Sequence, residues 1–98
     1  MDDTISPRKA AIAARAFQDG LLVEDAPLIG VIDTDALYAT INDLRSSFPN
    51  FFTHAFAAKA NTMPAVLDLV RKWGMACEVA SPGEYKAAVQ AGFVGGEI

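Results

Sequence analysis

The pattern of apolar and polar residues at the start of the chain predicts a helix and then a strand. Ser6 and Pro7 are typical of a helix start, because a serine hydroxyl accepts an early backbone N–H and proline suits the first helical position. The alanine-rich helix that they open is predicted to end at Gly20. Residues 28–32 form an apolar run that is too short for a helix and rich in branched residues, which predicts a strand.

The middle of the chain is predicted to form a helix followed by a strand. Asp33 or Thr34 caps the helix, and Pro49 and Asn50 interrupt it. Residues 51–60 then follow a strand pattern. The apolar residues of the helix fall on one face at helical spacing: Leu37, Ile41, Leu44 and Phe48.

A further helix and a further short strand come next. Thr62 and Pro64 open the helix, Gly74 closes it, and residues 75–80 are predicted to be the strand. The apolar side of this helix carries Val66, Leu67, Val70 and Trp73.

Ser81 and Glu84 fit a capping box, in which each side chain satisfies a backbone donor of the other residue. They open a last helix that Gly92 ends, with a buried face predicted at Tyr85, Ala88 and Val89. From residue 51 the order is strand, helix, strand, helix with short connections. This order predicts the α/β class, with a parallel sheet built from βα units.

Composition and charge narrow the possible partners. The 98 residues are 52% hydrophobic, which allows one modest core, and their net charge of −4 comes without a cluster of Lys and Arg. The negative net charge argues against binding to nucleic acid or to an anionic membrane, because both require a cluster of basic residues on the protein surface. Small molecules or proteins are therefore the expected partners.

The sequence also bears on location and on cysteine chemistry. Acidic residues stand where a secretory signal has a basic region, and no apolar stretch approaches the roughly 20 residues that cross a bilayer, so we expect a cytoplasmic protein. Cys77 is the single cysteine, which excludes an internal disulfide and a thiolate metal cluster. We expect it to be a small core residue, and we expect no metal site.

Lys59 is the residue with the clearest chemical potential. Period-two geometry places it on one strand face with Thr53, Ala55 and Ala57, at the carboxyl end of the strand, where active-site groups of βα folds gather. A lysine amine condenses with an aldehyde only in its neutral form, which partial burial favours. The alternative is a lysine that reaches from the strand end into solvent. The opposite face carries His54, Phe56 and Ala58, and His54 and Phe56 are expected to pack rather than catalyse.

Two motifs resemble a known family. The segments FAAKANTMPAVLDLVRKWGM and CEVASPGEYKAAVQAGF are similar to the N-terminal part of the pyridoxal-phosphate-dependent decarboxylases of the alanine-racemase-like fold, the group that acts on diaminopimelate, ornithine and arginine. The resemblance implies a partial (β/α)8 barrel, with residues 34–98 as the start of the cofactor-binding barrel domain and an N-terminal helix and entry strand in residues 1–33. It implies pyridoxal 5'-phosphate as cofactor and Lys59 as its Schiff-base lysine.

The resemblance also implies roles for two acids. Glu78 stands where members of the family commonly have aspartate close to the cofactor lysine, so it is a candidate cofactor-binding residue, with a structural ion pair as the alternative. Glu84 corresponds to a glutamate near the cofactor site; capping explains it without any ligand, and one residue can do both. We expect Ser81 to act as a cap only.

The function implied is decarboxylation of a diamino acid such as diaminopimelate or ornithine, by an enzyme that is a homodimer when full length. The groups that hold the cofactor phosphate and the pyridine nitrogen in this family lie downstream, so residues 1–98 alone are expected to be inactive. Two alternatives remain. One is another protein of the same barrel, a racemase or a pyridoxal-phosphate homeostasis protein, and the other is a non-catalytic homologue that binds a protein partner.

Overall fold

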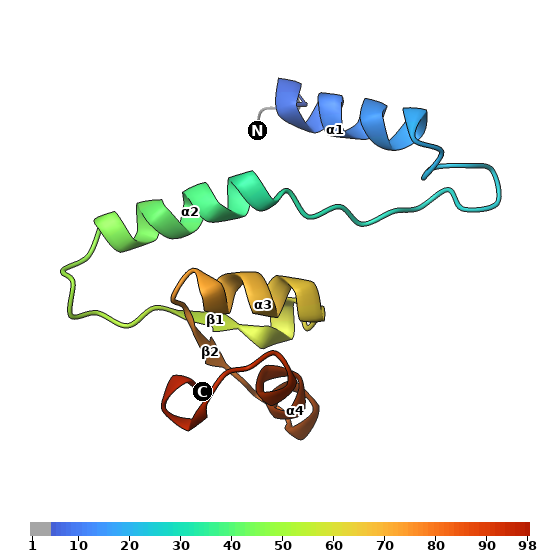
Figure 1. The fold of residues 1–98 in the computed structure, drawn as a ribbon. Helices are drawn as coiled ribbons and strands as arrows, with labels where there is room; N and C mark the ends of the chain where they lie inside the picture. Colours follow the sequence, from blue (N-terminus) through green and yellow to red (C-terminus); the bar gives the residue numbers. More distant parts are fainter. Residues whose placement is uncertain (1–4) are drawn as a thin grey trace. The chain divides into compact units, whose positions relative to one another are not determined.

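The computed structural model describes residues 5–98, which divide into two compact units. The first unit ends at Asp33, and the second, here called the αβ unit, spans Thr34–Ile98. Figure 1 shows the elements in chain order. They are α1 (Pro7–Gln18), α2 (Thr34–Ser46), β1 (Ala55–Ala57), the 3-10 turn η1 (Ala58–Ala60), α3 (Pro64–Lys72), β2 (Ala76–Glu78), α4 (Pro82–Gln90) and the 3-10 turn η2 (Gly95–Glu97).

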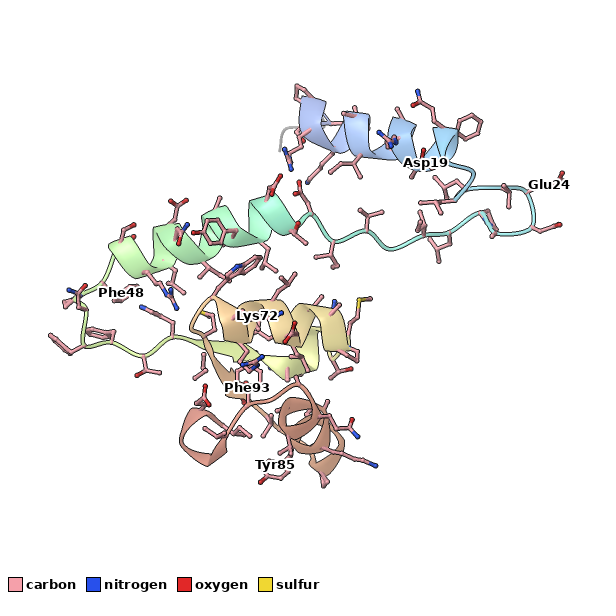
Figure 2. The ribbon with its side chains drawn as sticks, viewed as in Figure 1. Asp19, Glu24, Phe48, Lys72, Tyr85 and Phe93 are labelled. Carbon is pink, nitrogen blue, oxygen red and sulfur yellow. The ribbon has the colours of Figure 1, made fainter. Side chains whose placement is uncertain are left out.

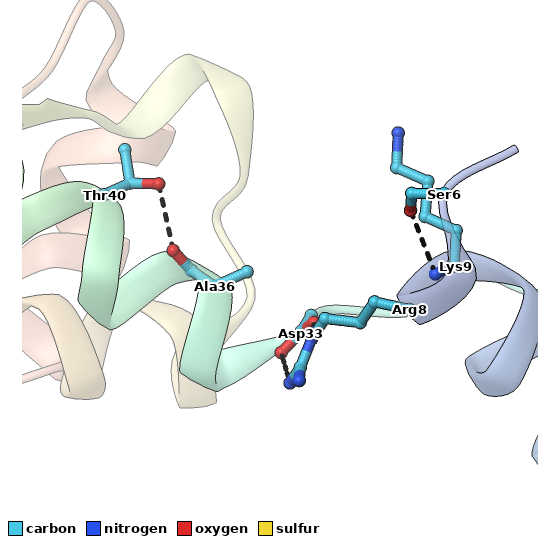
Figure 3. A network of polar contacts seen from close by, with 6 residues as sticks. All are labelled: Ser6, Arg8, Lys9, Asp33, Ala36 and Thr40. Atoms are coloured by element: carbon cyan, nitrogen blue, oxygen red, sulfur yellow. Dashed lines mark hydrogen bonds and ion pairs between the residues drawn. The ribbon is translucent and has the colours of Figure 1, made fainter. Parts of the chain in front are cut away.

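Helix α1 begins as its sequence predicts. The Ser6 hydroxyl accepts a hydrogen bond from the backbone N–H of Lys9 at 3.2 Å, and Pro7 occupies the first helical position. Within the same unit, the Arg8 guanidinium pairs with the Asp33 carboxylate, with Nη2 donating to Oδ1 at 2.8 Å (Figure 3). This ion pair joins the helix to the end of the segment that follows it.

The prediction of a strand at residues 28–32 is wrong. These residues are extended but belong to no sheet, and the Leu28 side chain is 91% exposed. The backbone pairing nearest to them in sequence is an isolated bridge between Val23 and Ala26. A strand is defined by its hydrogen-bonded partner, and no described residue pairs with residues 28–32.

The αβ unit contains the predicted parallel sheet. Strands β1 and β2 pair in parallel, with Ala55 opposite Ala76, Phe56 opposite Cys77 and Ala57 opposite Glu78. Each strand has three residues, so both are shorter than the predicted ranges 51–60 and 75–80. A turn at residues 50–51 and a loop at residues 52–54 precede β1, and η1 ends the strand after Ala57, so the strand is limited to the residues between them.

The core of the αβ unit forms between helix α3 and the sheet. Leu67 and Val70 of α3 are fully buried, as predicted for the apolar side of that helix, and Trp73 is partly buried. Phe56 packs against this cluster, as expected. The buried residues of the cluster are Ile41, Ala58, Leu67, Val70, Met75, Cys77, Ala88 and Phe93.

Helices α2 and α4 bury less than their sequences predict. On α4, Ala88 is buried, but Tyr85 is 52% exposed and Val89 is 48% exposed, so the predicted buried face is wrong for those two side chains. The alanines of α4 make the contact instead, because their small side chains let the helix backbone approach the core. On α2, Ile41 is buried, whereas Leu44 remains partly exposed; Phe48 lies beyond the end of the helix at Ser46 and is also partly exposed.

A polar link joins the carboxyl ends of α3 and α4. Arg71 Nε donates to the carbonyl oxygen of Ala91 at 2.9 Å, and Arg71 Nη2 lies 3.0 Å from Asp68 Oδ1. Hydrogen bonds from Lys72 and then Arg71 lower the pKa of the Asp68 carboxyl below its ordinary value. Gly92 has φ +103°, and a Cβ there would lie 3.0 Å from Arg71 Nε, so glycine suits both the conformation and the close contact.

Cys77 is a core residue, as expected. Its side chain is buried in β2, and it is a free thiol. Burial raises the pKa of the Cys77 thiol, and the negative charges of Glu78 and Glu84 add to the effect. Within residues 5–98, no helix is long and apolar enough to cross a membrane, and no three potential metal ligands gather at one point.

Candidate functional site

Lys59 lies in the turn that directly follows strand β1. It is the middle residue of η1, Ala58–Ala60, and its side chain is exposed. The prediction that Lys59 shares a strand face with Ala55 and Ala57 is therefore wrong, because the 3-10 turn ends the period-two alternation at Ala58. Partial burial, the condition that would favour the neutral amine, is not seen within residues 5–98, where the Lys59 side chain is exposed.

The backbone on both sides of Lys59 is held firmly. Ala58 is fully buried in the core cluster, so the residue before the lysine is packed. The backbone N–H of Asn61 donates to the carbonyl oxygen of Ala58 at 3.1 Å, and Asn61 Oδ1 accepts from the N–H of Met63 at 2.8 Å. This second bond is ordinary asparagine turn chemistry. The lysine amine is exposed, but its backbone is fixed.

Glu78 ends strand β2 at the same edge of the sheet. In the register it pairs with Ala57, which is two residues before Lys59, so the two functional candidates follow adjacent parallel strands. Figure 1 shows both strands running in the same direction, with β1 leading into η1 and β2 into the loop before α4. We call this side of the sheet the carboxyl-end edge. Glu78 is exposed, and neither it nor Lys59 forms an ion pair with any residue between 5 and 98.

Glu84 is anchored at the start of α4. The Ser81 hydroxyl accepts from the Glu84 N–H at 3.1 Å, which is the predicted cap. The Glu84 carboxylate reaches back, with Oε1 accepting from the N–H of Ala80 at 3.1 Å and Oε2 accepting from the Ser81 hydroxyl at 2.9 Å. In an ideal capping box the Glu84 carboxylate would accept from the backbone N–H of Ser81. Here it accepts from the backbone N–H of Ala80. Both carboxylate oxygens are engaged, so the position of this charge is fixed.

An open cavity of about 470 Å³ adjoins the carboxyl-end edge. Two of its lining residues, Thr62 and Ser81, come shortly after the ends of the strand segments, and Glu84 contributes its carboxylate. The sequence did not single out Thr62 or Gln90 as lining residues. Thr62 could have been predicted as a lining residue from its position just beyond a strand end, where binding groups lie in βα folds. The full lining is Thr62, Pro64, Ser81, Gly83, Glu84, Ala87, Gln90 and Ala91.

His54 lies at the other end of β1, away from Lys59. Its ring is half-buried and meets the ring of Phe48 edge to face, with 5.3 Å between centroids. The expectation that this histidine packs is confirmed.

Comparison with known proteins identifies the αβ unit. Residues 34–98 match the family model described as the pyridoxal binding domain of pyridoxal-dependent decarboxylases. The chain belongs to this family. It is also 41% identical, over 69 residues, to a diaminopimelate decarboxylase of Bacteroides thetaiotaomicron, a match that covers 67% of this chain and 18% of the relative. No solved structure gives a significant match.

These findings confirm that the chain resembles the pyridoxal-dependent decarboxylases and that pyridoxal phosphate is the family's cofactor. The chemistry at the carboxyl-end edge fits that group. An aldehyde cofactor requires a primary amine that it can reach, and Lys59 is exposed, without an ion-pair partner among the described residues, and flanked by the small side chains of Ala58 and Ala60. The chain spans about a fifth of the length of the curated relative.

Proposed function

We propose that Lys59 is the lysine that binds pyridoxal phosphate covalently, in a decarboxylase that acts on a diamino acid such as diaminopimelate or ornithine. One observation carries the proposal: in a chain of the pyridoxal-binding family, an exposed amine follows the first strand of a parallel pair. This is the place where βα folds present reactive groups. The αβ unit, residues 34–98, is then the start of a (β/α)8 barrel domain.

The cofactor, when bound, supplies the electron sink that makes loss of carbon dioxide from an amino acid possible. Lys59 would hold the cofactor aldehyde through its Nζ. The fixed backbone of η1 limits where that amine can travel, so the turn orients the attachment point. Because the Lys59 side chain is exposed, a substrate amine would be able to approach the same place from solvent.

The two acids have separate proposed roles. Glu78, on the adjacent strand, places a carboxylate on the same edge of the sheet, where it would orient the Lys59 amine or the substrate amine. Glu84 is held by Ala80 and Ser81, so it provides a stationary charge beside the cavity at the start of α4. We propose that Glu84 both caps the helix and borders the cofactor site.

The substrate class follows from the relative that is named diaminopimelate decarboxylase, and it is proposed for this chain on that similarity. The partner is therefore a small amino acid that carries a second amino group. We further propose that the full-length enzyme is a homodimer and works in the cytoplasm. Residues 1–98 alone are expected to be inactive, because they supply one side of the site.

The function is tested by a decarboxylation assay. The full-length protein is incubated with pyridoxal phosphate and with diaminopimelate, ornithine, arginine or norleucine, and released carbon dioxide is measured. We expect release from a diamino acid and none from norleucine, which has no distal nitrogen. Racemisation without carbon dioxide would instead favour a racemase, and no turnover of any amino acid would favour a homeostasis protein or a non-catalytic homologue.

A further inference from the structure

A second cavity lies at the opposite edge of the sheet, where the strands begin. It measures about 300 Å³, and its lining comes from the end of α2, the loop before β1 and the turn before β2. Figure 2 labels Phe48 at the start of that loop. The lining residues are Arg45, Pro49, Asn50, Phe52, Thr53, His54 and Gly74. This lining contains no carboxylate, although the whole chain has a net charge of −4.

Arg45 is packed against the backbone of the cavity wall. Its guanidinium lies so close to Gly74 that a Cβ at that position would collide with Nη2 and would lie 3.3 Å from Cζ. Gly74 has φ +83°, a conformation that glycine adopts without strain. No described residue pairs with the Arg45 guanidinium through a hydrogen bond or an ion pair. The Arg45 guanidinium therefore lies against Gly74 and has no acidic partner among the described residues.

Three more side chains bring hydrogen-bonding groups to the same cavity. Asn50 supplies an amide, Thr53 a hydroxyl and His54 an imidazole. The His54 backbone is tied to the sheet, because its carbonyl oxygen accepts from the Ala76 N–H at 2.9 Å, and its ring is seated against Phe48. Of these three side chains, His54 is therefore the one that the sheet and the Phe48 ring hold in place.

We propose that this cavity is a binding site for a small oxyanion, a phosphate or a carboxylate. A planar guanidinium can donate two parallel hydrogen bonds to such a group, and charge-assisted bonds of this kind are about twice as strong as neutral ones. The amide, hydroxyl and imidazole supply further donors around the same space, and no acid in the lining repels the anion. The site is separate from the cofactor site, since Lys59 stands at the other edge of the sheet.

The test follows the imidazole of His54 by NMR during a titration of the full-length protein with sodium phosphate, with sodium chloride adjusted to hold ionic strength constant. The His54 resonance is assigned by its loss in His54→Gln. We expect a saturable shift, and a dissociation constant at least about tenfold higher in Arg45→Gln, because the principal charge is lost. Lys86→Gln, which removes one exposed positive charge from α4, is expected to leave the titration unchanged.

One more variant and one more anion complete the experiment. Arg45→Lys keeps the charge without the planar fork, and we expect binding between that of the wild type and that of Arg45→Gln. Titration with acetate asks whether a carboxylate serves as well as a phosphate, and saturation by either anion supports the site. A linear shift with both anions, or equal titrations in wild type and Arg45→Gln, would overturn the proposal and leave Arg45 as a charge that offsets the carbonyl end of α2.

Discussion

In the full-length protein, Lys59→Ala is expected to remove the visible absorbance band that arises when pyridoxal phosphate is bound covalently to a lysine. The reason is chemical, since alanine has no amine to bond with the cofactor aldehyde. Decarboxylation is expected to fall by on the order of 10³-fold or more, as for removal of other covalent catalytic groups. The measurement is an absorbance spectrum after gel filtration, which removes unbound cofactor, followed by the carbon dioxide assay.

Lys86→Ala is the matched control for this variant. Lys86 is an exposed lysine on α4, so its loss removes the same charge without touching η1. We expect its spectrum and activity to equal those of the wild type. If Lys59→Ala kept the bound-cofactor band while Lys86→Ala lost it, the assignment of the cofactor lysine would be wrong.

Leu67→Ala is expected to lower the free energy of unfolding by about 2–5 kcal/mol, the range for truncation of a buried leucine. Leu67 is fully buried on α3, in the same cluster as Ala58 of η1. The cavity left by truncation would loosen the packing beside the turn that carries Lys59. The measurement is equilibrium unfolding in urea, with cofactor occupancy followed in the same samples.

Leu28→Ala makes the same chemical change at a side chain that is 91% exposed. Because little apolar surface returns to water there, we expect a change within about 0.5 kcal/mol. Equal losses of stability in Leu67→Ala and Leu28→Ala would contradict the placement of the core between α3 and the sheet.

The helices were predictable because their signals are local. A serine hydroxyl and a following proline are enough to define the start of α1, and Ser81 does the same for α4. Strands carry no such local signal, since they exist only where a partner pairs with them. Residues 28–32 have the composition of a strand and no partner among residues 5–98, whereas the three-residue strands β1 and β2 pair with each other.

The candidate site was predictable in part for the same reason. The order of elements predicts Lys59 at the carboxyl end of a strand, close to its observed place in the turn after β1, and its proposed role follows from the motif around it. The exposure of the Lys59 side chain could not be predicted from the sequence pattern, because a single 3-10 turn sets the direction in which the side chain leaves the strand. Likewise, the choice between Tyr85 and the alanines as the packed face of α4 depends on how closely that helix approaches the core.

The attachment of the cofactor to Lys59 can be located chemically. The full-length protein is incubated with pyridoxal phosphate, reduced with sodium borohydride, digested and mapped by mass spectrometry. We expect one stable pyridoxyl adduct, in the peptide that contains Lys59. An adduct confined to another lysine, or the absence of any adduct in protein that decarboxylates its substrate, would contradict this expectation.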